Sequence, residues 1–312
     1  MSICDYNTKF KGVNSISQDL LLNILESNFK MFFDWAFLNI GAWFDATSTF
    51  YNNTSHNNLI LVEDPSYEYG SVWQGIRKDW VWESGVSFND HSPININGIN
   101  INNSFISNGF NIDYPLGRVI LDDPVLESSN INLDYSYRYV QIYRATDTPW
   151  LSILQYSSYE TNNADILQTD SGDWSIGGNH RIQLPCIIIE PLARSRSLPY
   201  EIGNNNLLIE QDIAFHILAE NQNDRNKLLD ILRLQQDMTI WLFDTNELAQ
   251  NDEFPLDYNG SLKSNALNYP SIIEKYKWRK CFIKNVNLFD IDSVHTNLYR
   301  GFVKITTEII SE

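Results

Sequence analysis

The chain is poor in cysteine and in basic residues, and both shortages limit what it can be. Its 312 residues include three cysteines, Cys4, Cys186 and Cys281, which lie far apart and form no Cys-x-x-Cys pair. Neither a disulfide framework nor a zinc site is expected, and a reducing compartment suits the chain. Lysine and arginine number 22 against 39 aspartates and glutamates, so the net charge is -17. Such a surface repels phosphates, which argues against sequence-specific binding of nucleic acid.

Long uninterrupted apolar stretches are also missing. Residues 20–40 are the most apolar region, but five polar residues interrupt it: Asn23, Glu26, Asn28, Lys30 and Asp34. A membrane span does not tolerate that many polar groups. The N-terminus lacks the basic, apolar and small-residue order of a signal peptide. We therefore expect a protein that is made in the cytoplasm and has no membrane partner.

The common catalytic and nucleotide-binding motifs are absent as well. The chain contains no GxGxxG, GxSxG, HExxH or GxxxxGK[ST], the patterns that most often mark such sites. His216 lies inside an apolar strand pattern, where a hydrogen-bonded core histidine is expected rather than a ligand. Cys186 lies among apolar residues, which raise the pKa of a thiol and make it unreactive. We expect no enzymatic activity, no cofactor and no metal.

The first regular element expected is a long helix that begins after Ser17 and ends at Gly41. Ser17 can accept a hydrogen bond as the N-cap, and Asp19 in the first turn suits the positive end of the helix dipole. Apolar residues recur at three- and four-residue spacing from Leu21 to Phe33, which marks one buried face. Glycine after the last turn is a common helix end.

Residues 59–146 show the pattern of short antiparallel strands, which favours a β sandwich or small barrel. Within 94–101, isoleucines alternate with asparagines on both sides of Asn97-Gly98. An Asn-Gly pair fits the two positive φ angles of a type I′ turn, so a hairpin is expected there. A second tight reversal is expected at Pro115–Gly117, because proline presets one torsion and glycine permits the other.

The C-terminal third, residues 207–310, has the pattern of a mixed α/β module. We expect strands at 207–218 and 239–243 and a closing antiparallel pair at 278–288 and 298–310. Between the first two strands, 221–238 carries a helical stripe that Asn221 or Asn223 can cap. Residues 244–268 are polar and are expected to form a long loop.

Two aromatic groups are candidate interface residues. The tyrosines alternate along one expected strand, where they would form a platform for sugar stacking or pack against the core or a protein partner. The tryptophans flank basic residues, a combination that is common at protein contacts, with ordinary core packing as the alternative. The candidates are Trp73, Arg77, Trp80, Trp82, Tyr135, Tyr137 and Tyr139.

Two patches of the chain resemble virion proteins of tailed bacteriophages. Residues 113–119 and 135–140 are similar to hairpins of phage neck and tail proteins. Residues 224–232, a helix between two strands and ahead of a strand pair, are similar to tail-terminator and tail-completion proteins. The resemblance implies an α/β subunit that forms a ring, a hexamer by analogy, and that caps the tail tube or joins it to the head.

We therefore expect an α+β protein with an N-terminal helix and loop (1–58) belonging to the core module, an antiparallel sandwich-like or barrel-like β domain (59–146), and a β-α-β-β-β module (147–312). The resemblance implies a non-enzymatic virion protein whose partners are further copies of itself and other neck or tail proteins. DNA would pass through the ring, and an acidic lumen would not retain its phosphates. Two alternatives remain open: a peripheral tail or baseplate protein that binds a receptor or glycan, and a glycan-active enzyme with paired carboxylates.

Overall fold

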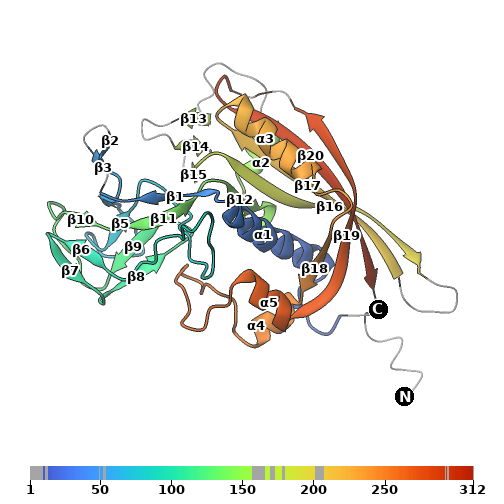
Figure 1. Cartoon of the computed structure of the whole chain (residues 1–312), viewed down its shortest axis with the longest axis horizontal. Helices are drawn as coiled ribbons and strands as arrows, with labels where there is room; N and C mark the ends of the chain where they lie inside the picture. Colours follow the sequence, from blue (N-terminus) through green and yellow to red (C-terminus); the bar gives the residue numbers. More distant parts are fainter. Residues whose placement is uncertain are drawn as a thin grey trace.

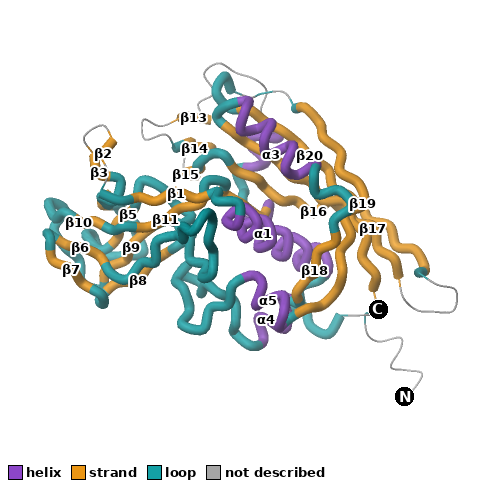
Figure 2. The backbone as a smooth tube through the Cα atoms, in the orientation of Figure 1, coloured by secondary structure: helices purple, strands orange, loops and turns teal. Residues whose placement is uncertain are grey.

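The computed structural model describes residues 10, 13–48, 50–51, 54–156, 166–168, 173–177, 180–200, 207–291, 293 and 295–311. These residues form an α+β protein, as predicted, with a long N-terminal helix, several antiparallel sheets and a curled sheet that makes half a barrel (Figure 1). In Figure 2 the long helix lies in the hollow of the curled sheet, and the smaller sheets lie to one side of it.

The curled sheet has six strands and organises the molecule. The order of its strands is β12 (Gln141–Arg144), β16 (Cys186–Pro199), β17 (Leu207–Ala219), β20 (Tyr299–Ser311), β19 (Lys277–Asp290) and β18 (Thr239–Phe243). The β12–β16 pair is parallel, and the other neighbours in this sheet are antiparallel. The four strands predicted in the C-terminal third are thus confirmed, including the closing pair β19–β20.

Two helices, α1 (Leu21–Asn39) and α3 (Gln222–Arg233), cover the concave side of this sheet. The apolar stripe of α1 packs on β17, where the rings of Phe29 and Phe33 meet Phe215 edge-on at centroid distances of 5.9 and 5.4 Å. Leucines of α3 join the same core. As predicted, Asn221 caps α3, since its side-chain oxygen accepts from the backbone N–H of Asp224 at 2.8 Å.

The start of α1 differs from the prediction. The helix begins at Leu21, and its N-cap residue Leu20 makes no side-chain capping bond. Asp19 lies before the first turn, and its backbone N–H donates to the side chain of Asn246 at 2.7 Å. A long-range contact therefore replaces the local cap expected from Ser17. The end is as predicted, because Gly41 follows the helix with a φ of 76°.

The smaller sheets are built from short strands between residues 43 and 138. These are β1 (Trp43–Ala46), β2 (Phe50–Tyr51), β3 (Thr54–Ser55), β4 (Ile60–Leu61), β5 (Val72–Gln74), β6 (Ile99–Ile101), β7 (Ser104–Ile106), β8 (Phe110–Asp113), β9 (Arg118–Leu121), β10 (Ile131–Asn132) and β11 (Tyr135–Arg138). They pair as β1-β11, β2-β3, β10-β6-β7 and β4-β5-β9-β8. The reversal predicted at Pro115–Gly117 is confirmed, since Asp113 pairs with Arg118 and Gly117 has a φ of 63°.

The remaining elements cover the outer side of the large sheet at one end and the rim of the helix side. They are a 3₁₀ turn (Ala145–Asp147), α2 (Leu151–Tyr156), β13 (Ile166–Gln168), β14 (Trp174–Ile176), β15 (His180–Ile182), α4 (Thr245–Gln250) and α5 (Tyr269–Lys275). The predicted loop at 244–268 thus contains a helix, because Asp244 accepts hydrogen bonds from the backbone N–H groups of Asn246 and Glu247 and caps it.

The prediction of a hairpin turn at Asn97-Gly98 is wrong, because the turn follows the strand that was expected to come after it. The turn lies instead at Asn102-Asn103, whose φ angles are 50° and 65°, between β6 and β7. Asparagine adopts this left-handed conformation more readily than other residues with a side chain. Strand β6 pairs with β7 on one edge and with β10 on the other, and Ile99 of β6 is buried in the core. The long-range pairing with β10 therefore fixes the register of β6, and with it the position of the turn.

We expect Gly98→Val to lower the free energy of unfolding by about 1–3 kcal/mol through overpacking. Gly98 does not have a positive φ. A Cβ atom there would lie 2.3 Å from the Phe105 ring and 2.5 Å from the carbonyl oxygen of Ile106, so the backbone of β7 would have to move. Urea denaturation measures the change. Asn97→Val at the exposed neighbouring position is the control, and an equal loss in both variants would contradict the steric explanation.

Candidate functional site

Three of the predicted interface residues belong to the core of the smaller sheets. Trp73 is 3% exposed, and Trp80 and Tyr135 are 0% exposed. The rings of Trp80 and Tyr135 stack at a centroid distance of 4.2 Å. Ser136 and Arg138 on the opposite face of β11 are buried as well. Because each of these three side chains is itself buried, none offers a surface to a partner, which corrects their assignment as interface anchors.

The other candidates are half-buried and divide between two places. Arg77 lies 5.7 Å from the centre of the Tyr137 ring. Phe44, which the sequence analysis missed, is exposed and contacts both Tyr137 and Tyr139, with ring centroids 6.0 and 5.5 Å apart. These four side chains border a small hollow of about 80 Å³. Trp82 lies elsewhere, in the wall of a much larger cavity.

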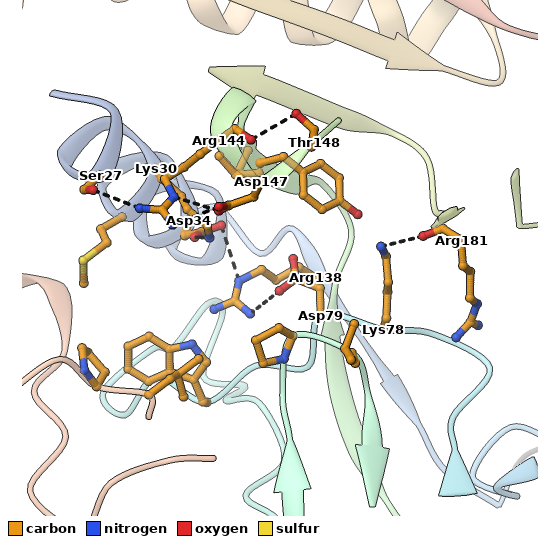
Figure 3. A pocket seen from close by; sticks show the side chains of 18 of the residues that line it. Ser27, Lys30, Asp34, Lys78, Asp79, Arg138, Arg144, Asp147, Thr148 and Arg181 are labelled. Carbon is orange, nitrogen blue, oxygen red and sulfur yellow. Dashed lines mark hydrogen bonds and ion pairs between the residues drawn. The ribbon is translucent and has the colours of Figure 1, made fainter. Parts of the chain in front are cut away.

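That larger cavity, the central cavity, encloses about 650 Å³ between α1, the β11–β12 segment, the turn after β5 and residues 254–256 (Figure 3). Three aspartates line it: Asp34, Asp79 and Asp147. Twice as many basic residues line it: Lys30, Lys78, Arg118, Arg138, Arg144 and Arg181. Basic side chains thus outnumber acidic ones in the wall, and Asp64, Glu83 and Asp173 behind it pair with Arg118, Arg138 and Arg181.

Arg138 is the most deeply buried of these basic residues, with 4% of its surface exposed. Its guanidinium donates to Asp79 at 3.2 Å, to the carbonyl of Trp80 at 2.8 Å and to Glu83. Burial raises the pKa of Asp79 and of Glu83, although Arg138 opposes the change. Burial alone would lower the pKa of Arg138, but the surrounding carboxylates outweigh it and raise the pKa.

Lys78 differs from the other basic residues of the central cavity. Its Nζ donates to the carbonyl of Arg181 at 2.8 Å and lies 5.0 Å from the centre of the Tyr143 ring. Among the described residues, no carboxylate forms an ion pair with it. Burial lowers the pKa of Lys78 to about 8, with Asp79 acting in the opposite direction. The ammonium is thus charged at neutral pH but poorly compensated.

Two further residues considered in the sequence analysis behave as expected. His216 on β17 forms a hydrogen bond with Glu190 at 2.7 Å and is buried, which confirms a satisfied core histidine. Cys186 on β16 is buried, and burial raises the pKa of its thiol to about 12. In the part of the chain that the structure describes, no three histidine, cysteine, aspartate or glutamate side chains gather as metal ligands would.

A second concave surface, the outer-face groove, lies on the convex side of the large sheet and encloses about 490 Å³. Its apolar wall consists of Leu208, Trp241, Trp278, Phe282 and Ile310, and its polar wall of Thr239, Arg279, Lys280 and Glu308. Trp241 points outward because its neighbours on β18, Ile240 and Leu242, point into the core. Basic groups lie over these rings, with Lys280 4.9 Å from Trp241 and Arg279 4.0 Å from Trp278.

Sequence reasoning missed both of these sites for the same reason. Trp241 and Lys280 become neighbours only when β18 pairs with β19. The wall of the central cavity likewise combines side chains from Ser27 to Leu256. The one local signal was the cluster of aromatic and basic residues at 73–82, which led to Trp82 but also to residues of the core, and Lys78 was not among the predicted interface residues.

Comparison of the chain with protein-family models and with curated proteins found no match. Within the described residues, no helix combines the length and the apolar character needed to cross a membrane. Function is therefore inferred from the geometry and charge of the central cavity and the outer-face groove.

Proposed function

We propose that the protein is a non-enzymatic structural subunit that forms a closed ring at the neck or tail end of a tailed bacteriophage, as a tail terminator or head–tail connector. The outer-face groove is the observation that supports this proposal. It is an open surface of aromatic, aliphatic and basic side chains on a strongly acidic chain. Such a surface suits an acidic and apolar partner, and another copy of the same chain is acidic.

Most of the two edges of the large sheet is protected against pairing with a strand of another chain. Contact between copies is therefore expected through particular side-chain patches. Among the described strands, β17 alone pairs with residues 190–199 of β16. This free edge carries Pro191, Arg194 and Pro199, together with a register shift before Ser195. Prolines, charges and bulges are the devices by which proteins prevent edge pairing.

The opposite end of the sheet is also protected. The side chain of Asn28 on α1 bonds both backbone groups of Phe243 on the outer strand β18. An open stretch of edge remains on β19, at residues 285–290, where Leu288 and Phe289 are exposed. This stretch is the patch that we place in the groove of the neighbouring copy. Contact between two different patches can close into a ring when the rotation between copies permits it.

The proposal extends to the assembly as a whole. The ring is a hexamer in the virion, it contacts other neck or tail proteins, and DNA passes through it without sequence-specific contacts. A net charge of -17 suits such a passage, because acidic walls do not retain phosphates. If the protein instead binds a receptor or glycan, we expect a small number of copies at the periphery of the particle and no ring at the neck or tail end.

Lys280→Glu is expected to reduce incorporation of the subunit into particles at least about tenfold, because like charges across a contact are strongly unfavourable. Quantitative mass spectrometry of purified particles, made with the variant as the sole source of the protein, measures the copy number. Phe289→Lys should have the same effect from the other side of the contact, since it places a positive charge against a basic groove.

Lys227→Glu is the matched control, because Lys227 is an exposed lysine on α3 and belongs to neither patch. It should be incorporated like the wild type. Absence of the wild-type protein from the virion, or a single copy at a fibre tip, would refute the ring proposal. Turnover of a polysaccharide that is lost when a carboxylate is replaced would instead support the enzyme alternative.

A further inference from the structure

The basic residues of the central cavity are compensated unevenly. Ion pairs join Lys30 to Asp34 at 2.6 Å and Arg118 to Asp64 at 3.1 Å. Arg144 pairs with Asp147 at 2.8 Å, and Arg181 pairs with Asp173. Arg138 contacts three carboxylates. Lys78 alone among the six lining bases has no such partner within the described residues.

An uncompensated ammonium in this position is energetically unfavourable. Lys78 carries three N–H donors and uses one of them on the carbonyl of Arg181. Burial removes much of its hydration, and a buried charge without an ion-pair partner is unfavourable. Figure 3 shows Lys78 and Arg181 side by side at one end of the cavity, with Arg138 and Asp34 toward the other. An anion bound beside Lys78 would supply the missing charge and the missing acceptor.

The rest of the wall suits the body of a small molecule. A volume of about 650 Å³ lies within the usual range of ligand sites. Trp82, Tyr143 and Leu256 provide aromatic and aliphatic surface, while Gln74 and Thr148 provide polar groups. An inorganic ion would leave most of this space without contacts, so the wall suits an anion with an organic body.

We propose that the central cavity binds a sugar-sized organic anion, whose phosphate or carboxylate group lies against Lys78. This site shares no lining residue with the outer-face groove. It therefore does not depend on ring formation, and assembly can fail while anion binding holds.

Isothermal titration calorimetry with a small set of probes tests the site. Glucose 6-phosphate and glucuronate each combine a sugar ring with an acid group, a phosphate in the first and a carboxylate in the second. Glucose has the sugar ring without an acid group. Inorganic phosphate and acetate have the acid group without the ring. We expect glucose 6-phosphate or glucuronate to bind at least about tenfold more tightly than each of the other three, and to weaken as the salt concentration rises. The stronger of the two identifies the acid group. Equal binding of glucose, or no binding of either sugar acid, would overturn the proposal.

Lys78→Met should weaken the binding of the preferred anion by about tenfold or more, because it removes a charged hydrogen-bond donor. Lys227→Met on the surface of α3 removes the same charge and should leave binding unchanged. Unaltered affinity in Lys78→Met, or an equal loss in both variants, would place the anion elsewhere or show a general charge effect.

The stability of the same variants shows whether loss of binding comes from misfolding. The pKa of Lys78, about 8, lies below its ordinary value of 10.5, so between these two values the unfolded chain holds a proton that the folded protein has released. The Lys78 contribution to stability therefore rises with pH across that window. Lys78→Met should lose this rise and be at least as stable as the wild type at pH 7.

The titratable groups around Lys78 are Asp79, Cys186, Arg181, Asp173 and Tyr143. Burial raises the pKa of Cys186 to about 12 and raises that of Tyr143, so neither titrates in the lower part of that window. Affinity for the preferred anion should accordingly fall as the pH rises from 7 to 9. Constant affinity over this range in the wild type would contradict the role of the ammonium.

Discussion

Replacing Arg138 by methionine is expected to lower the free energy of unfolding by about 3–5 kcal/mol, the cost of breaking a buried ion pair by removing one partner. Methionine keeps much of the length of the side chain and removes its charge. Asp79 and Glu83 would lose their guanidinium donor, and Asp34 would keep Lys30 as its cation. Urea denaturation at pH 7 measures the loss.

The pH dependence of this loss separates electrostatics from packing. Burial already raises the pKa of Asp79 and Glu83 in the wild type, and removal of Arg138 should raise both further. When a folded carboxyl has a pKa above its unfolded value, the folded state holds the extra proton, and stability declines as the pH rises through that window. The deficit of Arg138→Met should therefore be smaller at pH 5 than at pH 8.

Arg144→Met provides the comparison, because Arg144 pairs with Asp147 near the surface, where an ion pair contributes at most about 1 kcal/mol. A deficit for Arg138→Met that is the same at pH 5 and pH 8 would show that lost packing, and not unpaired carboxylates, causes it. A deficit no larger than that of Arg144→Met would contradict the buried cluster itself.

The second large effect is expected at Asn28, where leucine should cost about 2–5 kcal/mol. Asn28 is 1% exposed. Its amide accepts from the backbone N–H of Phe243 at 2.8 Å and donates to the carbonyl of the same residue at 3.1 Å. Leucine has a similar volume and leaves both backbone groups without that partner, each at a cost of about 1–3 kcal/mol.

Thermal and urea denaturation of Asn28→Leu test this expectation. Asn23→Leu on the exposed face of the same helix controls for the effect of leucine on helix formation and should change stability by less than about 0.5 kcal/mol. Hydrogen exchange adds a local measurement, since the amide of Phe243 should lose protection in Asn28→Leu. Retained protection there would show that another group satisfies the strand edge.

The parts of the fold that sequence reasoning predicted are those fixed by local pattern. The strands from Leu207 onward are long, apolar and alternating, and Asn221 has the right spacing to cap α3. The turn at Asn97-Gly98 satisfied local rules equally well, yet pairing with β10 made Asn102-Asn103 the turn. The local signal favoured Asn97-Gly98 alone, and a pairing with residues some 30 positions later places the turn at Asn102-Asn103 instead.

The candidate sites were harder to predict, because burial on both faces of a strand conceals which side chains are available. Alternation along β11 separated the tyrosines from Ser136 and Arg138 correctly, but it could not show that Tyr135 and Arg138 are both enclosed. The ion pairs of Arg138 reach Asp34, more than one hundred residues earlier. No spacing rule relates such residues, so the gathering of basic side chains around the central cavity is visible only in three dimensions.

The position of β20 has a consequence for how the chain folds. Although β20 is the last of the six strands in sequence, it lies inside the large sheet, between β17 and β19. The residues of β17 are synthesised 80 to 104 positions before their partners on β20, so during synthesis one long edge of β17 remains unpaired. Non-local pairings of this kind are slow to form and leave apolar strands open to other chains in the meantime. Completion of the core is therefore a late event in biosynthesis, and the interval before it is when the chain has most need of a chaperone.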